Sequence, residues 1–125
     1  MKELSDEEMQ SVEGGAGSWG GAVTLNTNNY KFQHNLYPKR SLVKGADGVY
    51  TYDNTKVQRK NFNNKGKLTA YFGKSTLQLK LGSKVHNMVH CKIEGVGEGY
   101  VNVSVQKHSL TEAKIGDGVS NIPGK

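Results

Sequence analysis

The stretch that decides the fold is Thr76-Leu77-Gln78-Leu79-Lys80-Leu81, in which polar and apolar side chains alternate without a break. Successive side chains of a β-strand point to opposite faces, so the three leucines share one face, and Gln78 and Lys80 share the other. An apolar face behind a polar face is typical of a strand that covers a core on one side and meets solvent on the other. The alternation therefore predicts a half-buried strand.

Further strand patterns lie on both sides of this stretch. Residues 68–72 precede it across Gly73-Lys74-Ser75, which predicts a hairpin loop, and the glycine-rich residues 95–99 predict a turn into a strand over 101–105. Other short strands are predicted at 21–25, 30–33, 41–43, 49–52 and 85–93, between turn signals such as Asp47-Gly48 and Asn63-Asn64. Short strands at this spacing predict an all-β fold, a small antiparallel β-sandwich or barrel.

The composition limits what such a chain can be. With 125 residues, it is long enough for one folded domain. Its mean hydropathy is −0.65, and no apolar run approaches the ~18 to 20 residues of a membrane-spanning helix. The single cysteine, Cys91, excludes an internal disulfide and a cysteine-rich zinc site. We expect a domain held together by burial and hydrogen bonds, without cofactor or metal.

Charge divides the chain into two segments. The formal net charge is +6, yet residues 1–15 hold one lysine and five acidic residues, a net charge of −4 that leaves +10 for residues 16–125. The composition changes at Gly14-Gly15, which predicts a boundary between two functional segments. At the other end, residues 110–125 are rich in glycine and predict a flexible tail.

The acidic segment has the features of a short helix. Ser5 is a suitable N-cap, acidic residues occupy the first turn, and Gly14-Gly15 ends the pattern. Leu4, Met9 and Val12 would form one apolar stripe on this helix. A helix this short is marginal alone in water, so the segment is expected to be disordered until the stripe meets a partner. The alternatives are a frayed acidic tail, or a helix packed on the main domain.

Seven positions of this segment resemble the double-glycine leader of bacteriocins and related exported peptides of Gram-positive bacteria. They are Leu4, Ser5, Glu8, Met9, Val12, Gly14 and Gly15. The resemblance implies recognition by the cysteine-peptidase domain of an ABC transporter, which cleaves after Gly15 and exports the remainder. It further implies that Leu4, Met9 and Val12 fill apolar pockets of the peptidase and that Glu8 makes a polar contact. Two residues without Cβ atoms suit the narrow cleft of such a peptidase.

On this basis we expect a secreted, bacteriocin-like antibacterial protein, made in the cytoplasm with a leader that is removed on export. Residues 16–125 would be the mature β-rich domain, and a small immunity protein would accompany it. This segment departs from the pore-forming members of the family, which are much shorter and carry an amphipathic or small-xxx-small helix that is absent from the pattern here. The alternative is a secreted binding module or intercellular signal that uses the same export route.

Few residues offer catalytic or metal chemistry. On a strand, His86 and His90 would lie about 13 Å apart, too far to share a zinc ion, and both would be exposed while Cys91 is buried. A helical stripe through residues 85–89 would bring the two histidines together and is the alternative. Another alternative is a catalytic Cys91 activated by His34 or His108. We expect no enzyme and no metal site.

The positive charge of residues 16–125 is the remaining functional signal. Six basic residues could form one surface together with Tyr50, Tyr52, Phe62 and Tyr71; they are Lys39, Arg40, Arg59, Lys60, Lys65 and Lys67. Such a surface would attract an anionic bacterial envelope, at roughly 1 kcal/mol for each Lys or Arg near a membrane. The alternative is a solvated face that only keeps the protein soluble. Nucleic acid is not expected as a partner, because no helix-turn-helix or ribonucleoprotein motif is present.

Overall fold

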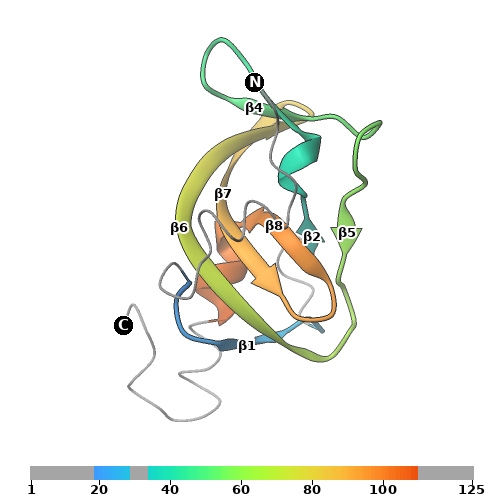
Figure 1. Cartoon of the computed structure of the whole chain (residues 1–125), viewed down its shortest axis with the longest axis vertical. Helices are drawn as coiled ribbons and strands as arrows, with labels where there is room; N and C mark the ends of the chain where they lie inside the picture. Colours follow the sequence, from blue (N-terminus) through green and yellow to red (C-terminus); the bar gives the residue numbers. More distant parts are fainter. Residues whose placement is uncertain (1–18, 29–33, 110–125) are drawn as a thin grey trace.

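The computed structural model describes residues 19–28 and 34–109, and strands dominate this part of the chain (Figure 1). Six strands form a mixed sheet, β3-β4-β6-β7-β8 with β1 on the edge of β6, and a second sheet pairs β2 with β5. The predicted all-β fold class is confirmed. Within the described ranges the large sheet does not close into a barrel, so the barrel alternative is not met.

The centre of the large sheet is a long hairpin of β6 (Lys67–Leu81) and β7 (Lys84–Ile93). Its turn contains Gly82, whose φ of 63° lies in the left-handed region that glycine enters without steric cost. The predicted face of leucines is confirmed, since Leu79 is buried and Leu77 and Leu81 pack against the same cluster. Figure 1 shows β6 curving along its whole length around the other strands.

The hairpin loop predicted at residues 73–75 is wrong, because β6 continues through them. Phe72 pairs with Cys91 and Thr76 with Val89, so three residues of β6 face a single residue of β7. This is a β-bulge, which bends the strand and increases its twist. The Gly-Lys-Ser sequence resembles a turn, but β7 is long enough to pair with β6 on both sides of it.

Two short strands share the other edge of β6. β1 (Val23–Asn26) pairs antiparallel with the first part of β6, and β4 (Tyr50–Tyr52) pairs parallel with the last part. β3 (Leu42–Lys44) completes the sheet beside β4. The predicted strands at 21–25, 41–43 and 49–52 are therefore confirmed within two residues, although the parallel pair departs from the antiparallel expectation. The strand predicted at 30–33 lies outside the described residues.

The strand predicted over 101–105 is wrong in its second half. β8 (Gly97–Asn102) ends at Asn102, and residues 103–109 are helical. The side-chain oxygen of Asn102 accepts a hydrogen bond from the backbone N–H of Ser104 at 2.9 Å, as an N-cap does. The alternating valines are compatible with a strand or a helix here, and the N-cap at Asn102 favours the helix. Within the described ranges, no helix is long and apolar enough to cross a membrane.

The small sheet of β2 (Asn35–Leu36) and β5 (Lys60–Asn61) lies against β8. An isolated antiparallel bridge between Tyr37 and Tyr100 joins the two sheets. This close approach requires Gly99, because a Cβ at that position would overlap the carbonyl group of Tyr37. After β2, a 3₁₀ turn, η1 (Lys39–Ser41), leads the chain into β3.

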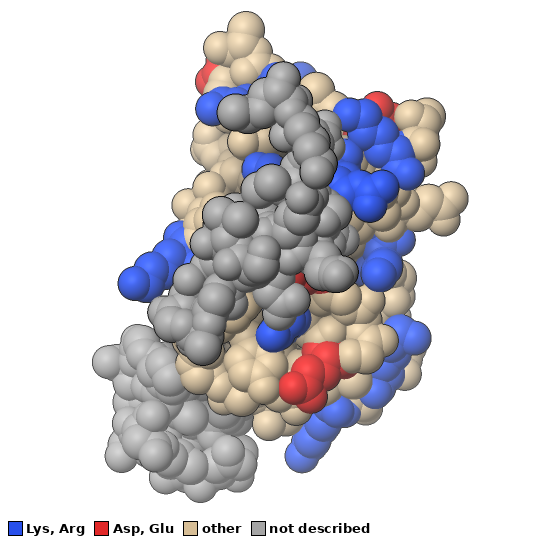
Figure 2. All heavy atoms as spheres, in the orientation of Figure 1, with Lys and Arg blue, Asp and Glu red and all other residues tan. Residues whose placement is uncertain are grey.

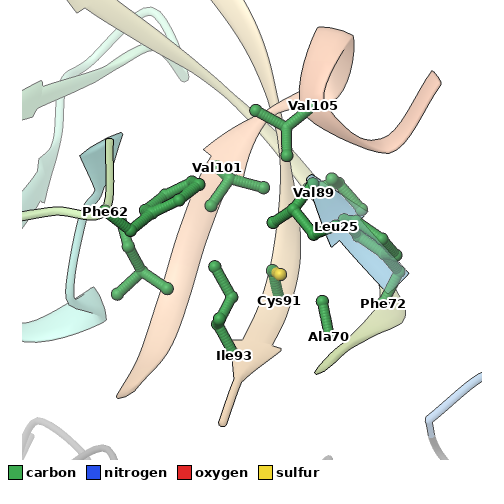
Figure 3. Packing of buried hydrophobic residues seen from close by; sticks show 10 residues of the cluster. Leu25, Phe62, Ala70, Phe72, Val89, Cys91, Ile93, Val101 and Val105 are labelled. Carbon is green, nitrogen blue, oxygen red and sulfur yellow. The ribbon is translucent and has the colours of Figure 1, made fainter. Parts of the chain in front are cut away.

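Buried apolar side chains form two clusters. The first, which we call the aliphatic cluster, collects side chains from both sheets and from the helical residues 103–109 (Figure 3). Its buried members are Leu25, Leu36, Phe62, Ala70, Phe72, Val89, Cys91, Ile93, Val101 and Val105. The second, the tyrosine cluster, consists of Tyr37, Leu42, Leu79, Met88 and Tyr100, with Tyr50, Tyr52, Leu77 and Leu81 partly buried against it. Neighbouring residues of β7, Met88 and Val89, point to different clusters, so both faces of this strand are covered.

Candidate functional site

The structure tests only part of the predicted site. Leu4, Ser5, Glu8, Met9, Val12, Gly14 and Gly15, the residues expected to direct recognition and cleavage, lie outside the described residues. The tail predicted over 110–125 lies outside them too. The six predicted basic residues are all described, so their positions show whether they form one surface.

Lys39 and Arg59 each lie over a tyrosine ring of β4. The Nζ of Lys39 is 5.0 Å from the ring centre of Tyr50, and the guanidinium carbon of Arg59 is 5.9 Å from that of Tyr52. Both separations are in the range of cation–π attraction. Tyr50 and Tyr52 are two residues apart on one strand, so their rings share a face. We call these four residues the cationic tyrosine surface.

This surface is anchored to the tyrosine cluster beneath it. The rings of Tyr52 and Tyr37 meet edge to face at 5.1 Å, and Lys39 also lies 5.7 Å from the ring centre of Tyr100. Burial raises the pKa of Tyr37, an effect that the positive charge of Arg59 partly offsets. Among the described residues, no carboxylate forms an ion pair with Lys39 or Arg59. Their charges are therefore available to a partner.

The other predicted basic residues are not part of this surface. Lys60 donates its Nζ hydrogen to the carbonyl of Val96 at 3.1 Å, beside the turn between β7 and β8. Lys65 and Lys67 lie near β1, where the Lys65 N–H donates to Thr27 and Lys67 pairs with Asn26. Arg40 follows Lys39 in η1 and is exposed.

Two of the aromatic residues expected beside these cations also lie elsewhere. Phe62 is fully buried in the aliphatic cluster, which corrects its predicted place on the surface. Tyr71 belongs to a separate group, since the Nζ of Lys92 lies 5.1 Å from its ring centre and its hydroxyl is 3.1 Å from Glu94. Figure 2 shows Lys and Arg side chains along the right-hand side of one face, with few acidic side chains beside them.

A polar groove adjoins the cationic tyrosine surface and shares two residues with it. It has a volume of about 480 Å³ and lies between the end of β4, the following loop and the small sheet. We call it the amide groove, after its lining by Asn35, Tyr52, Asn54, Gln58, Arg59 and Asn61. The four amide residues were not among the predicted site residues, although the density of Asn and Gln between residues 54 and 64 is a signal that points to three of them, Asn54, Gln58 and Asn61.

The predicted exposure of His90 is wrong, because its side chain is 2% exposed. Its ring lies between those of Trp19, at 4.5 Å between centres, and Tyr100, at 5.3 Å. Its Nε2 is 2.8 Å from Oε2 of the buried Glu98, a partner that β7–β8 pairing brings to the same face. Burial lowers the pKa of His90 to about 4, and Lys39 adds to this effect. The imidazole is therefore neutral at pH 7, and its Nε2 shares a hydrogen bond with the Glu98 side chain.

Cys91 is buried in the aliphatic cluster, as predicted. The strand pattern over residues 85–93 also predicts Val85 on the same face as Cys91, but Val85 is 49% exposed. Val85 lies next to the hairpin turn, where it pairs with Lys80 of β6. Burial raises the pKa of the Cys91 thiol, which disfavours the thiolate that a nucleophile needs.

The helical alternative for His86 and His90 is excluded, because both lie on β7. His86 has a different neighbour from His90, since its Nδ1 is 3.3 Å from the side-chain amide of Asn102. Within the described ranges, no group of three or more His, Cys, Asp or Glu side chains is arranged to hold a metal ion.

No family model, no curated protein and no solved structure matches the chain.

Proposed function

We propose that the chain is the precursor of a secreted, bacteriocin-like antibacterial protein. Its leader, residues 1–15, directs it to a peptidase-containing ABC transporter, which cleaves after Gly15. The β domain then reaches an anionic bacterial envelope through its positive charge. The observation that carries the envelope step is the cationic tyrosine surface, where Lys39 and Arg59 lie over tyrosine rings and form no ion pair with a described carboxylate.

The chemistry of this surface suits an anionic, amphipathic boundary. A tyrosine ring holds the cation by its π face, and the ring itself is supported from below by the buried tyrosine cluster. The cations are therefore held in place before a partner arrives, which lowers the entropic cost of binding. Each Lys or Arg near an anionic membrane surface contributes about 1 kcal/mol.

The second candidate function is a secreted binding module or intercellular signal that shares the export route. The amide groove favours it, since its volume of about 480 Å³ is in the range of small-molecule sites and polar side chains line it. Killing of related strains by the processed, secreted protein supports the first candidate. Binding to cells without killing supports the second.

The leader is tested by a Gly15→Val change. A β-branched side chain clashes in a cleft shaped for glycine, so the variant is expected to stay uncleaved. Mass spectrometry of secreted material decides, and normal cleavage of the variant, or an intact Met1 on the wild type, contradicts the leader assignment.

Leu4→Asp and Met9→Asp are expected to block cleavage as well, because each puts a charge into an apolar pocket of the peptidase. An equal loss of thermal stability in both variants would instead support a helix packed on the domain.

The surface is tested by charge reversal at two places. Lys39→Glu with Arg59→Glu is expected to abolish binding to bacterial cells at low salt. Lys65→Glu with Lys67→Glu changes the charge equally near β1 and is expected to weaken binding much less. An equal loss in both double variants shows that net charge alone drives binding, and contradicts the role of the cationic tyrosine surface.

A further inference from the structure

The amide groove has the size and the lining of a binding site for a polar ligand. Its volume of about 480 Å³ is within the range of small-molecule pockets, ~300 to 1,000 Å³. The lining contains three asparagines, a glutamine, a tyrosine and an arginine, and no carboxylate. The lining is mostly polar. We therefore expect a ligand to bind mainly through hydrogen bonds and charge.

The groove's internal hydrogen bonds leave several amide groups available. Asn61 uses its side-chain oxygen to accept from the N–H of Asn63 at 3.0 Å, and its side-chain nitrogen donates to Asn35 at 3.3 Å. These two bonds hold the side chains of Asn61 and Asn35 together and do not use the Asn35 side-chain nitrogen. Among the described residues, the amides of Asn54 and Gln58 make no hydrogen bond. Each of them presents one donor group and one acceptor to a ligand.

Arg59 is placed at the edge of this array with its backbone fixed. Its N–H donates to the hydroxyl of Tyr52 at 2.8 Å, while its guanidinium lies over the same ring at 5.9 Å. The guanidinium has a planar fork of donors that matches a carboxylate. No acidic side chain in the described part of the chain competes for it.

We propose that the amide groove binds a saccharide whose rings carry acetamido groups and a carboxylate. The side-chain amides of Asn54 and Gln58 pair with acetamido groups, which also have one donor and one acceptor, and sugar hydroxyls fill the remaining positions. The carboxylate lies against Arg59. This inference rests on the proposed function, since it names the envelope component that the secreted domain would meet. A peptide with apolar side chains fits less well, because the lining of the groove is mostly polar.

The test uses the full chain labelled with ¹⁵N and the disaccharide N-acetylglucosaminyl-N-acetylmuramic acid as the probe. Its addition is expected to shift the side-chain amide signals of Asn35, Asn54 and Gln58. The trimer of N-acetylglucosamine, which lacks the carboxylate, is expected to bind more weakly, and maltotriose, which lacks both groups, is expected not to bind. Arg59→Gln is expected to lower the affinity for the disaccharide by about tenfold, the usual loss for a hydrogen bond to a charged group.

Arg40→Gln is the matched control, because it removes the same charge from an exposed residue outside the groove, and it is expected to leave affinity unchanged. The inference is overturned if no saccharide shifts these signals at millimolar concentration, if maltotriose binds as well, or if a peptide stem without sugar binds in place of the disaccharide. If the protein binds no saccharide but still binds cells in a charge-dependent way, only this inference is overturned. If the protein binds the saccharide but does not kill bacteria, this inference is supported and the proposed antibacterial function is contradicted.

Discussion

The two apolar clusters are built in different ways, although the same hairpin of β6 and β7 supplies both. The aliphatic cluster is filled by side chains such as Leu25, Phe72 and Ile93, which make no hydrogen bonds. The tyrosine cluster is bordered by polar groups that are bonded to one another, including the pair of Ser75 and Tyr100 at 2.6 Å. Burying polar groups is tolerated only when each has a partner. The stability of the aliphatic cluster therefore depends on packing alone. The stability of the tyrosine cluster depends on packing and also on the protonation state of the polar groups that border it.

The largest expected effect is in the aliphatic cluster. Phe62→Ala removes a fully buried ring, and we expect the free energy of unfolding to fall by about 3 to 5 kcal/mol. Chemical denaturation with fluorescence or circular dichroism measures it. A loss below about 1 kcal/mol would mean that the ring is exposed, as the sequence pattern had predicted.

Leu79→Ala tests the tyrosine cluster in the same way, by truncating a buried side chain. Leu79 is fully buried there, so its truncation is expected to cost about 2 to 5 kcal/mol. If the protein loses much less than this, the tyrosine cluster collapses around the gap and is softer than the aliphatic cluster. The comparison is made by the same denaturation experiment under identical conditions.

Protonation distinguishes the two clusters most directly. An unfolded histidine titrates near pH 6.5, whereas the pKa of His90 in the folded chain is about 4. Between these values the unfolded chain binds a proton that the folded chain does not bind, so the free energy of unfolding falls as the pH falls. At ~1.36 kcal/mol per pKa unit, the loss is about 3 kcal/mol across this window.

The measurement is the denaturation midpoint of the wild type and of His90→Gln at several values from pH 7 to pH 4. The variant is expected to lack this part of the pH dependence, while Phe62→Ala retains it. A free energy of unfolding that stays constant or rises as the pH falls would show that Glu98 holds His90 in its charged form.

The smallest effects are expected on the outer face of β6. Gln78 and Lys80 are exposed, and replacing either with alanine is expected to change the free energy of unfolding by no more than ~0.5 kcal/mol. These two variants are the matched controls for Leu79→Ala, since they flank it on the same strand. A larger loss in either would show that this face is covered.

The sequence predicted burial correctly where it follows from the polarity of the residue itself. Alternation located the leucine face of β6 and the burial of Cys91, because apolar side chains must leave water wherever the strand lies. It did not locate the burial of His90, since that depends on Glu98 and Trp19, which only strand pairing and chain packing bring to it. It also missed the bulge at residues 73–75 and the helical residues 103–109, where long-range pairing and an N-cap override local pattern.

The candidate site was predicted in a similar, partial way. Basic and aromatic residues were identified by type, yet of the six predicted basic residues only Lys39 and Arg59 lie over predicted tyrosine rings. Spacing along the chain does not say which loops meet. The amide groove needs residues from β2, β4, β5 and a loop to converge, and no local motif encodes this.

The complete burial of Cys91 has a consequence for how its thiol responds to oxidants. A disulfide forms when a thiolate attacks another sulfur, which requires both exposure and ionisation. Cys91 is 0% exposed, and burial raises its pKa, so the folded chain presents an inert thiol. Two folded copies are therefore not expected to become linked covalently through this residue.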